Sequence, residues 1–263
     1  MNVNWHPDIE FKINGLIGEG SFAEVYSGQW QGQPVAVKKF REFPIEHEIS
    51  INQRLFSYLS IQQCPHLVQT KSILTTRSVP WGFIMELCET DLAARLEHKQ
   101  DLREWYSGEE IIRLIIQLCR ATQCLHEVGF VHLDIKPGNI CLKNDVVKLG
   151  DFGAGAFIGS TVMPIPPEER GMRLAPECYQ DSVVVTPAMD IYAIGQVACL
   201  MMSLGEYNHY DRFPEKIGQR YLHLIPIIAL MMNWNPTQRP SAAEAIVMLS
   251  TPPRIQSSCC ALL

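Results

Sequence analysis

The sequence predicts an α+β fold of two lobes, a smaller one built mainly of strands and a larger one built mainly of helices. Up to about residue 85, short alternating or β-branched runs dominate the chain, whereas long apolar runs with helical spacing dominate after Glu86. The chain has 263 residues, 47% of them hydrophobic, and can bury a substantial core. We expect segment 86–90 to link the lobes, and clefts between lobes are common cofactor sites.

The first lobe is expected to be a sheet with one helix inserted, from about Ile45 to Leu59. Gln31 and Gly32 form a turn between two strands. The expected strands cover residues 13–17, 22–30, 34–40, 67–74 and 81–85. In the second lobe, the helical patterns cover residues 109–128, 188–203 and 241–249.

The composition argues against several functions. The formal net charge is -6 and basic residues are scattered, so no nucleic-acid partner is expected. The nine cysteines lack zinc-ligand spacing, and Cys119, Cys124 and Cys199 lie in apolar runs, which is typical of reduced, core-filling cysteines in cytosolic proteins. The first residues lack a secretory signal pattern, and the apolar stretches 191–204 and 222–232 are too short for membrane helices. We therefore expect a cytoplasmic protein.

A glycine-rich segment lies between the first two expected strands. It reads Ile17-Gly18-Glu19-Gly20-Ser21-Phe22-Ala23-Glu24-Val25. Ordinary hairpin turns also contain such patterns, so the segment alone is weak evidence. Because a strand follows it, and a dinucleotide-binding loop opens a helix instead, the segment is suited to fold over a triphosphate.

A lysine follows on the next expected strand, in the run Val35-Ala36-Val37-Lys38. Strand alternation places Ala36 and Lys38 on one face, so an apolar surface for a base and a cation for phosphate both face the cleft. The alternative is a surface lysine on an edge strand. A lysine placed toward phosphate needs a carboxylate partner, and we expect Glu48, with Glu46 as the alternative, because apolar residues follow Glu48 at helical spacings.

The strongest pattern combines two nearby runs. They are Val131-His132-Leu133-Asp134-Ile135-Lys136-Pro137-Gly138-Asn139 and Lys148-Leu149-Gly150-Asp151-Phe152-Gly153. Phosphoryl transfer needs a carboxylate at the attacking hydroxyl, a role that suits Asp134, and oxygen ligands for magnesium, a role that suits Asn139 and Asp151. Lys136 brings positive charge to the phosphate where negative charge develops.

From about residue 11 to residue 250, the chain resembles the protein kinase superfamily. Three more motifs match it: Ala175-Pro176-Glu177, Asp190-Ile191-Tyr192-Ala193-Ile194-Gly195, and the Arg239 of Asn235-Pro236-Thr237-Gln238-Arg239-Pro240. The resemblance implies an ion pair between Glu177 and Arg239. It also implies an N-terminal extension at 1–10, a kinase domain at 11–250 with lobes at about 11–85 and 91–250, and a tail at 251–263.

By the same resemblance, the chain would use ATP and Mg²⁺, with Lys38, Glu48, Asp134 and Lys136 as catalytic residues. Met85 would guard the back of the adenine pocket, and Asp91 would either reach the ribose or cap a helix. The other residues expected around ATP are Ile17, Gly18, Glu19, Gly20, Ser21, Val25, Ala36, Glu86, Cys88 and Cys141, with the base between Val25, Ala36 and Cys141 and the backbone of 86–88 meeting adenine.

Four features depart from the family pattern. Ala23 replaces the third glycine, a mild change. Leu133 replaces the arginine of H-R-D, which removes the usual cationic contact for an activation-loop phosphate. The segment 169–174 lacks the threonine that bonds the catalytic aspartate and lysine in serine/threonine kinases. Residues 207–220 form a short segment where family members carry a substrate-docking helix.

The acceptor and the function class leave alternatives open. The runs 132–139 and 168–173 resemble the Wee/Myt group, the kinases that inhibit cyclin-dependent kinases, and this likeness allows tyrosine as acceptor, whereas Lys136 indicates serine or threonine. A pseudokinase scaffold is the main alternative to an active protein kinase, and the complete set of Lys38, Asp134, Asn139 and Asp151 favours the enzyme. A small-molecule kinase is disfavoured, because such enzymes usually lack an A-P-E segment.

The chain ends Ser257-Ser258-Cys259-Cys260-Ala261-Leu262-Leu263. Cys260 begins a C-a-a-X pattern whose final leucine favours geranylgeranyl attachment, and Cys259 offers a second acylation site. This pattern predicts peripheral membrane association. An unmodified hydrophobic tail is the alternative, because no polybasic stretch precedes the cysteines.

Overall fold

The computed structural model describes residues 11–20, 22–41, 46–76, 79–162, 174–180, 182–206 and 219–251. Several sequence-based expectations fall outside these ranges. They concern Ser21, the Wee/Myt-like run 168–173, the short segment at 207–218 and the lipidation site at Cys260.

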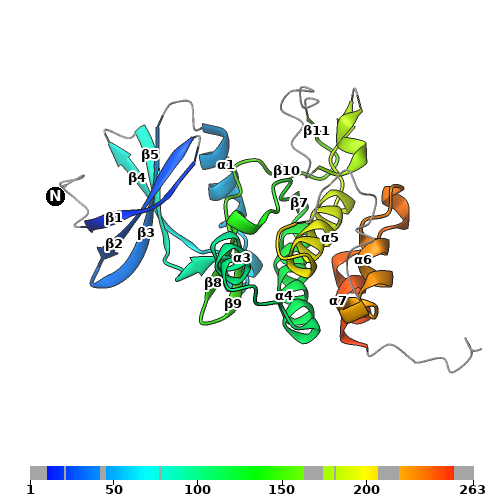
Figure 1. Cartoon of the computed structure of the whole chain (residues 1–263). Helices are drawn as coiled ribbons and strands as arrows, with labels where there is room; N and C mark the ends of the chain where they lie inside the picture. The colour runs from blue at the N-terminus through cyan, green and yellow to red at the C-terminus, as the bar shows by residue number, and fades with distance from the viewer. Residues whose placement is uncertain are drawn as a thin grey trace, which may run out of the picture.

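A five-stranded antiparallel sheet, with strand order β1-β2-β3-β5-β4, forms the first lobe (Figure 1). The strands are β1 (Phe11–Glu19), β2 (Ala23–Trp30), β3 (Gln33–Phe40), β4 (Thr70–Thr76) and β5 (Val79–Glu86). Trp30 pairs with Gln33, so Gln31 and Gly32 form the expected two-residue turn. Both turn residues have positive φ, at 51° and 75°, as the common two-residue hairpin turn requires.

The helix expected at 45–59 is in fact two helices, α1 (Glu46–Leu55) and α2 (Leu59–Gln63). The single-helix prediction is wrong because the chain turns between them. Ser57 donates its hydroxyl to the carbonyl oxygen of Arg54 at 2.6 Å, which satisfies a helix-end carbonyl, and Tyr58 adopts an extended backbone conformation.

The strand expected at 67–74 begins only at Thr70. Its first expected residues are used elsewhere, because Leu67 forms a bridge with Leu149 and Val68 donates its amide to the carbonyl oxygen of Leu149 at 2.9 Å. These bonds attach the segment before β4 to the second lobe.

Helices and short strand pairs form the second lobe (Figure 1). The helices are α3 (Leu92–Asp101), α4 (Gly108–Glu127), α5 (Ala188–Met202), α6 (Ile225–Met231) and α7 (Ala242–Ser250), with single 3₁₀ turns at Pro137–Asn139, Pro176–Tyr179, Gln219–Tyr221 and Pro236–Gln238. The strands are β6 (Thr90–Asp91), β7 (Phe130–Val131), β8 (Ile140–Lys143), β9 (Val146–Leu149), β10 (Ala156–Phe157), β11 (Thr161–Val162) and β12 (Val183–Val184). Three sheets result: β6-β8-β9, β7-β10 and β11-β12.

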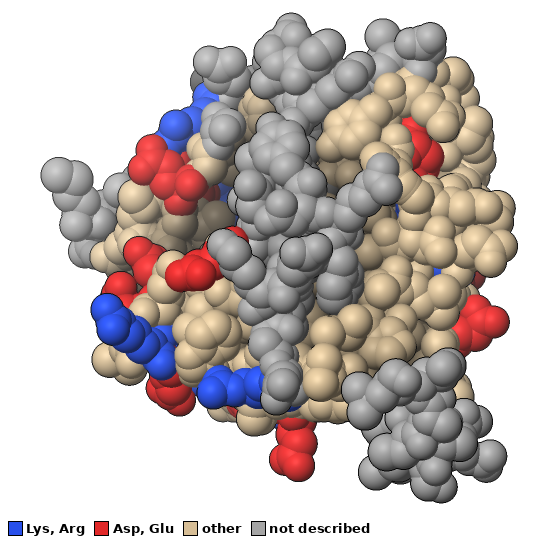
Figure 2. Space-filling view, turned by 45° about the vertical axis from the view of Figure 1, so that its right-hand side comes forward, with Lys and Arg blue, Asp and Glu red and all other residues tan. Residues whose placement is uncertain are grey.

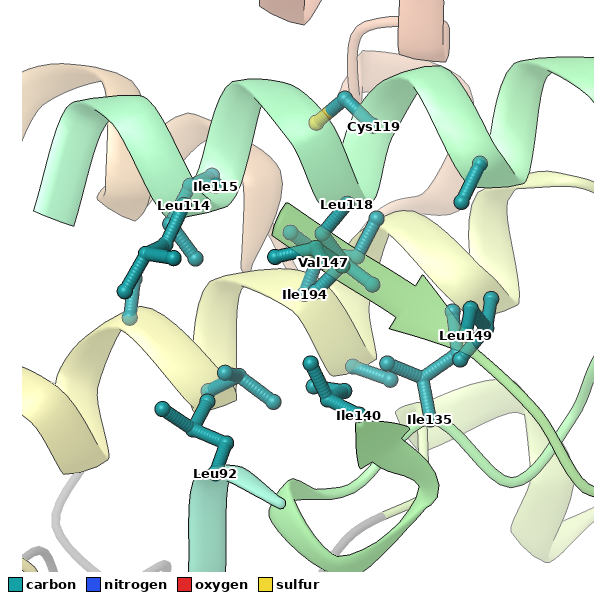
Figure 3. Packing of buried hydrophobic residues seen from close by; sticks show 14 of the residues in the cluster. Leu92, Leu114, Ile115, Leu118, Cys119, Ile135, Ile140, Val147, Leu149 and Ile194 are labelled. Carbon is teal, nitrogen blue, oxygen red and sulfur yellow. The ribbon is translucent and has the colours of Figure 1, made fainter. Parts of the chain in front are cut away.

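The main core lies in the second lobe, between α4, α5 and the β8-β9 hairpin. Figure 3 shows Leu118 of α4, Val147 of β9 and Ile194 of α5 meeting there, and each is at most 1% exposed. Ile51 and Leu55 of α1 belong to the same cluster, so helix α1 packs against the second lobe as well as the sheet. Among the described helices, none has both the length and the apolar character that crossing a membrane requires.

Both signs of charge occur on the surface. On the coloured part of the face in Figure 2, basic and acidic side chains lie beside one another at the left and lower edges, and uncharged residues cover much of the right side.

Candidate active site

Lys38 on β3 contacts two carboxylates from different parts of the chain. Its Nζ lies 2.6 Å from Glu48 Oε1 on α1 and 2.8 Å from Asp151 Oδ1, which follows β9. The structure therefore places Glu48, rather than Glu46, against the lysine. The side chains of Lys38 and Glu48 are only 11% and 17% exposed, whereas that of Asp151 is 46% exposed, so the lysine and the glutamate are shielded from water and the aspartate is partly open to it.

The contacts within this three-residue cluster change the pKa of each member. Burial favours a neutral amine, but Asp151 and Glu48 raise the pKa of Lys38 overall, so the lysine stays charged. Burial raises the pKa of Glu48, although Lys38 opposes this. For Asp151, the attraction of Lys38 outweighs burial and lowers the pKa.

Gly153 lies against the same glutamate. A Cβ atom at this position would lie 2.8 Å from Glu48 Oε2, closer than real Cβ contacts come. The glycine after Phe152 therefore lets α1 approach closely enough for Glu48 to reach Lys38.

The carboxylate of Asp134 is held by two neighbours in its own loop. Lys136 Nζ lies 2.6 Å from Asp134 Oδ2, and Asn139 donates its amide to the same oxygen at 2.9 Å and to the Asp134 carbonyl at 2.8 Å. The Asp134 side chain is 34% exposed. The carboxylate is therefore fixed in position but open to an incoming group.

A buried aspartate fixes the backbone of this loop. Asp190, at the start of α5, accepts hydrogen bonds from the amides of His132 and Leu133, both at 2.9 Å, and is 1% exposed. Leu133 has a φ of 63°, a strained conformation for leucine that these bonds stabilise. The sequence predicts the motif around Asp190 but not this role. A single acidic residue in the otherwise apolar start of α5 was the available signal.

One hydrogen bond and one aromatic contact join the Asp134 loop to the Asp151 segment. His132 Nε2 lies 2.9 Å from the carbonyl oxygen of Gly150. The buried ring of Phe152 packs edge-on against His132 and against Phe56, with centroids 5.7 Å and 6.0 Å apart. These contacts hold Asp151, whose φ is 62°, toward Lys38.

The region in which adenine is expected to bind contains residues of both lobes. Ala36 on β3 pairs with Met85 on β5, which places the small residue beside the expected pocket-guarding methionine. The Cys141 thiol donates a hydrogen bond to Cys88, which lowers the pKa of Cys88. This thiol pair between segment 86–90 and β8 was not expected from the sequence, since 53 residues separate its members in the chain.

The side chain of Glu86 points to the second lobe. Its two carboxylate oxygens each lie 3.0 Å from a lysine Nζ, one of Lys143 and one of Lys148. Burial opposes this charge, but the two lysines lower the pKa of Glu86 overall. The bonds join the end of β5 to the β8-β9 hairpin, so Glu86 ties the lobes together through its side chain.

Asp91 caps helix α3. Its Oδ1 accepts a hydrogen bond from the amide of Ala94 at 2.9 Å. Of its two expected roles, helix capping is therefore present, and Asp91 also pairs with Cys141 across β6 and β8.

The glycine-rich segment forms the β1-β2 hairpin. Gly18 pairs with Val25, and the amide of Gly20 donates to the carbonyl oxygen of Ala23 at 2.9 Å. The Glu19 carboxylate contacts Arg41 after β3. Ile17, Gly18 and Glu19 lie within β1, and the Ile17 side chain is exposed.

The ion pair implied for the second lobe is present. Arg239 donates from both terminal nitrogens to the Glu177 carboxylate, at 2.6 Å and 2.7 Å. The same guanidinium donates to the carbonyl oxygen of Ala188 at 2.9 Å, and its side chain is fully buried. The pair attaches the A-P-E segment to the start of α5.

Leu133, which replaces the arginine of the H-R-D pattern, lies in an apolar setting. It packs against a buried cluster of Ala175, Cys178, Val183 and Met189, which come from the A-P-E segment, β12 and α5. Arg54 of α1 lies over the ring of Phe157 at 3.5 Å. Apolar contacts thus hold the A-P-E segment against Leu133, and a cation-π contact holds β10 against α1.

The sheet lobe with its lysine cluster and the helical lobe with its aspartate loop together form the two-lobed arrangement of a kinase. Residues 11–248 match the family described as the protein kinase domain, and the chain belongs to this family.

Three relatives illustrate the similarity. Cyclin-dependent kinase F-4 of Oryza sativa subsp. japonica is 25% identical over 90% of this chain and 60% of its own length. The Wee1-like protein kinase of Arabidopsis thaliana is 31% identical over 62% of this chain and 33% of its own length. Cyclin-dependent kinase-like 1 of Caenorhabditis elegans is 32% identical over 69% of this chain and 51% of its own length. The chain thus spans a third to three fifths of these relatives, and the Wee1-like match confirms the Wee/Myt resemblance.

Proposed function

We propose that this chain transfers the γ-phosphate of ATP to a hydroxyl group of a protein. One observation carries the proposal: Lys38 contacts Glu48 and Asp151 at the same time. These residues come from the sheet, from α1 and from the second lobe. Their meeting gives a charged lysine for phosphate and a carboxylate for a metal ion in one place.

Asp134 is the proposed base for the acceptor hydroxyl. A carboxylate can accept the hydroxyl proton as the oxygen attacks, provided that it is held in place and accessible. Lys136 and Asn139 hold it, and its side chain is partly exposed. Lys136 also lies where it can exchange its contact with Asp134 for one with phosphate.

The residues proposed for magnesium fit that ion. Mg²⁺ prefers oxygen ligands and usually binds one or two carboxylates together with phosphate oxygens. Asn139 uses its amide nitrogen for Asp134, which leaves the side-chain oxygen for a cation. Asp151 uses one oxygen for Lys38, and its side chain is 46% exposed. When bound, magnesium offsets the negative charge of the phosphates.

The nucleotide would lie between the lobes. Val25, Ala36 and Cys141 are proposed to enclose the base, with Met85 behind it and the backbone of 86–88 at its polar edge. The segment 17–21 would cover the phosphates. The contacts that bring Cys88 and Asp91 to Cys141 support this arrangement.

We propose serine or threonine as the acceptor, because Lys136 follows Asp134 by two residues as in kinases with that specificity. Because the chain is also similar to Wee1-like kinases, the kind of acceptor residue needs to be measured directly. Phosphoamino-acid analysis of a labelled protein acceptor distinguishes the two kinds of hydroxyl.

The test uses the purified full chain with magnesium and ATP labelled at the γ-phosphate. We expect a rise in thermal stability with the nucleotide and transfer of label to protein hydroxyls. A chain that binds nucleotide without transferring label would instead be a scaffold. A chain that shows neither effect would contradict the proposed nucleotide site as well.

A further inference from the structure

Two cysteines that the proposed active site does not use lie with their sulfur atoms almost in bonding range. Cys64 ends α2, Cys124 lies in the last turns of α4, and 60 residues separate them in the chain. Their Sγ atoms are 2.6 Å apart. A disulfide has an S–S distance of about 2.05 Å, so closing the bond needs a movement of only about half an ångström.

The surroundings of the pair give its two thiols different pKa values, so that Cys64 is the nucleophile and Cys124 is its partner. The hydrogen bond donated by the Cys124 thiol lowers the pKa of Cys64 to about 7, and the amide of His66 and the charge of Lys148 act in the same direction. Burial and Glu127 oppose this change. The same hydrogen bond, together with burial, raises the pKa of Cys124. Near neutral pH, Cys64 is therefore the member of the pair that ionises, and Cys124 remains a thiol.

Solvent access to the pair is restricted. Cys64 is only 4% exposed, whereas Cys124 is half-buried and packs against the main core. A reagent of about the size of water fits this setting better than a bulky disulfide.

We propose that Cys64 and Cys124 form an oxidation site at which a hydroperoxide closes a disulfide between α2 and α4. The Cys64 thiolate attacks one peroxide oxygen, breaks the O–O bond and becomes a sulfenic acid, and hydroxide leaves. The Cys124 sulfur then attacks the Cys64 sulfur, and the sulfenic oxygen leaves as water. In total, two thiols lose two electrons, and one hydrogen peroxide is reduced to two waters.

Two other buried cysteines show what sets this pair apart. Burial alone raises the pKa of Cys119 and of Cys199 to about 12, so each remains a thiol at neutral pH. Cys119 lies on the same helix as Cys124, which makes it a matched control. Near neutral pH, oxidation is therefore directed to Cys64 rather than to Cys119 or Cys199.

The disulfide would act on the packing between the lobes. Helix α2 follows α1, and Ile51 and Leu55 of α1 share one core cluster with α4. A covalent bond from α2 to α4 would thus limit movement of the α1-α2 segment relative to the second lobe. We expect oxidation to raise the melting temperature by on the order of 5 °C or more.

Peptide mapping of the full chain tests the proposal. The reduced protein is treated with hydrogen peroxide, its free thiols are blocked with N-ethylmaleimide, and it is digested with trypsin. Cleavage after lysine and arginine, except before proline, places Cys64 in peptide 55–71 and Cys124 in peptide 121–143. We expect a reducible cross-link between these peptides, with a mass loss of about 2 Da for the pair.

The variants assign the link to its sulfur atoms. Cys64→Ser and Cys124→Ser should each lose the cross-link and the rise in melting temperature, whereas Cys119→Ser should keep both. Peptide 121–143 also contains Cys141. A link to 55–71 that persists in Cys124→Ser would therefore join Cys64 to Cys141 and overturn the proposal.

The wild-type protein gives a second, independent outcome. The proposal is wrong if peroxide oxidises other thiols while Cys64 and Cys124 are both recovered as maleimide adducts. It is also wrong if the cross-link forms equally fast in urea-unfolded protein, because the native contact would then not direct it.

Discussion

Lys38 and Glu48 lie 2.6 Å apart, although one belongs to the central strand of the sheet and the other to helix α1. The charge of the buried lysine is thereby tied to the position of this helix. We predict that Glu48→Gln lowers kcat by about tenfold or more, because Lys38 loses an ionic partner worth more than about 1.4 kcal/mol at the transition state. The control is Glu46→Gln, at an exposed position two residues earlier, which should keep wild-type rates. Equal losses in both variants would contradict this role.

The raised pKa of Glu48 predicts how activity falls in acid. Burial makes Glu48 take up a proton at a higher pH than an ordinary glutamate, and the proton removes its attraction for Lys38. As pH falls through this raised pKa, kcat/KM should decline. Protonation of Asp151 does not explain this decline in kcat/KM, because the pKa of Asp151 is lowered. Measured profiles should show the acid limb in wild type and its loss in Glu48→Gln, and an unchanged limb in the variant would argue against Glu48.

The Glu177-Arg239 pair predicts a large effect on stability. Glu177→Gln leaves the fully buried Arg239 guanidinium without its carboxylate, and breaking such a pair costs about 3 to 5 kcal/mol. Urea unfolding measures the change. The control is Arg41→Gln, which breaks an exposed pair with Glu19 and should change the free energy of unfolding far less. Equal effects of the two substitutions would show that burial does not set the strength of this pair.

The apolar setting of Leu133 predicts activity without phosphorylation of the activation segment. Leu133 packs on apolar side chains and offers no cation to a phosphate. The hydroxyl residues of segment 154–174 are Ser160 and Thr161, and Thr161 is paired in the β11-β12 ladder. We predict that the double variant Ser160→Ala, Thr161→Ala keeps most of the wild-type rate and that phosphatase treatment changes little.

A different receptor for phosphate would give the opposite result. Arg170 and Arg173 lie in the same segment of the sequence. A large loss of activity in the double variant, restored by acidic residues at positions 160 and 161, would indicate that such an arginine binds a phosphate there.

Local patterns and motif spacing predicted the two lobes and the meeting of Lys38 with a glutamate. They did not predict the break after Leu55, because a hydroxyl at Ser57 ends the helix within a continuous helical pattern. They also did not predict that Asp190 holds the Asp134 loop or that Cys64 meets Cys124. Such contacts join residues about 60 positions apart in sequence, and only the packing of helices brings them together.

The most direct test of the proposed function compares phosphate transfer by wild type and Asp134→Asn. The substitution removes the acceptor for the hydroxyl proton and leaves the proposed nucleotide residues in place. We predict near-complete loss of label transfer to a protein acceptor, together with wild-type thermal stabilisation by ATP and magnesium. Undiminished transfer by Asp134→Asn would contradict the account, because the carboxylate held by Lys136 and Asn139 would then have no part in the reaction.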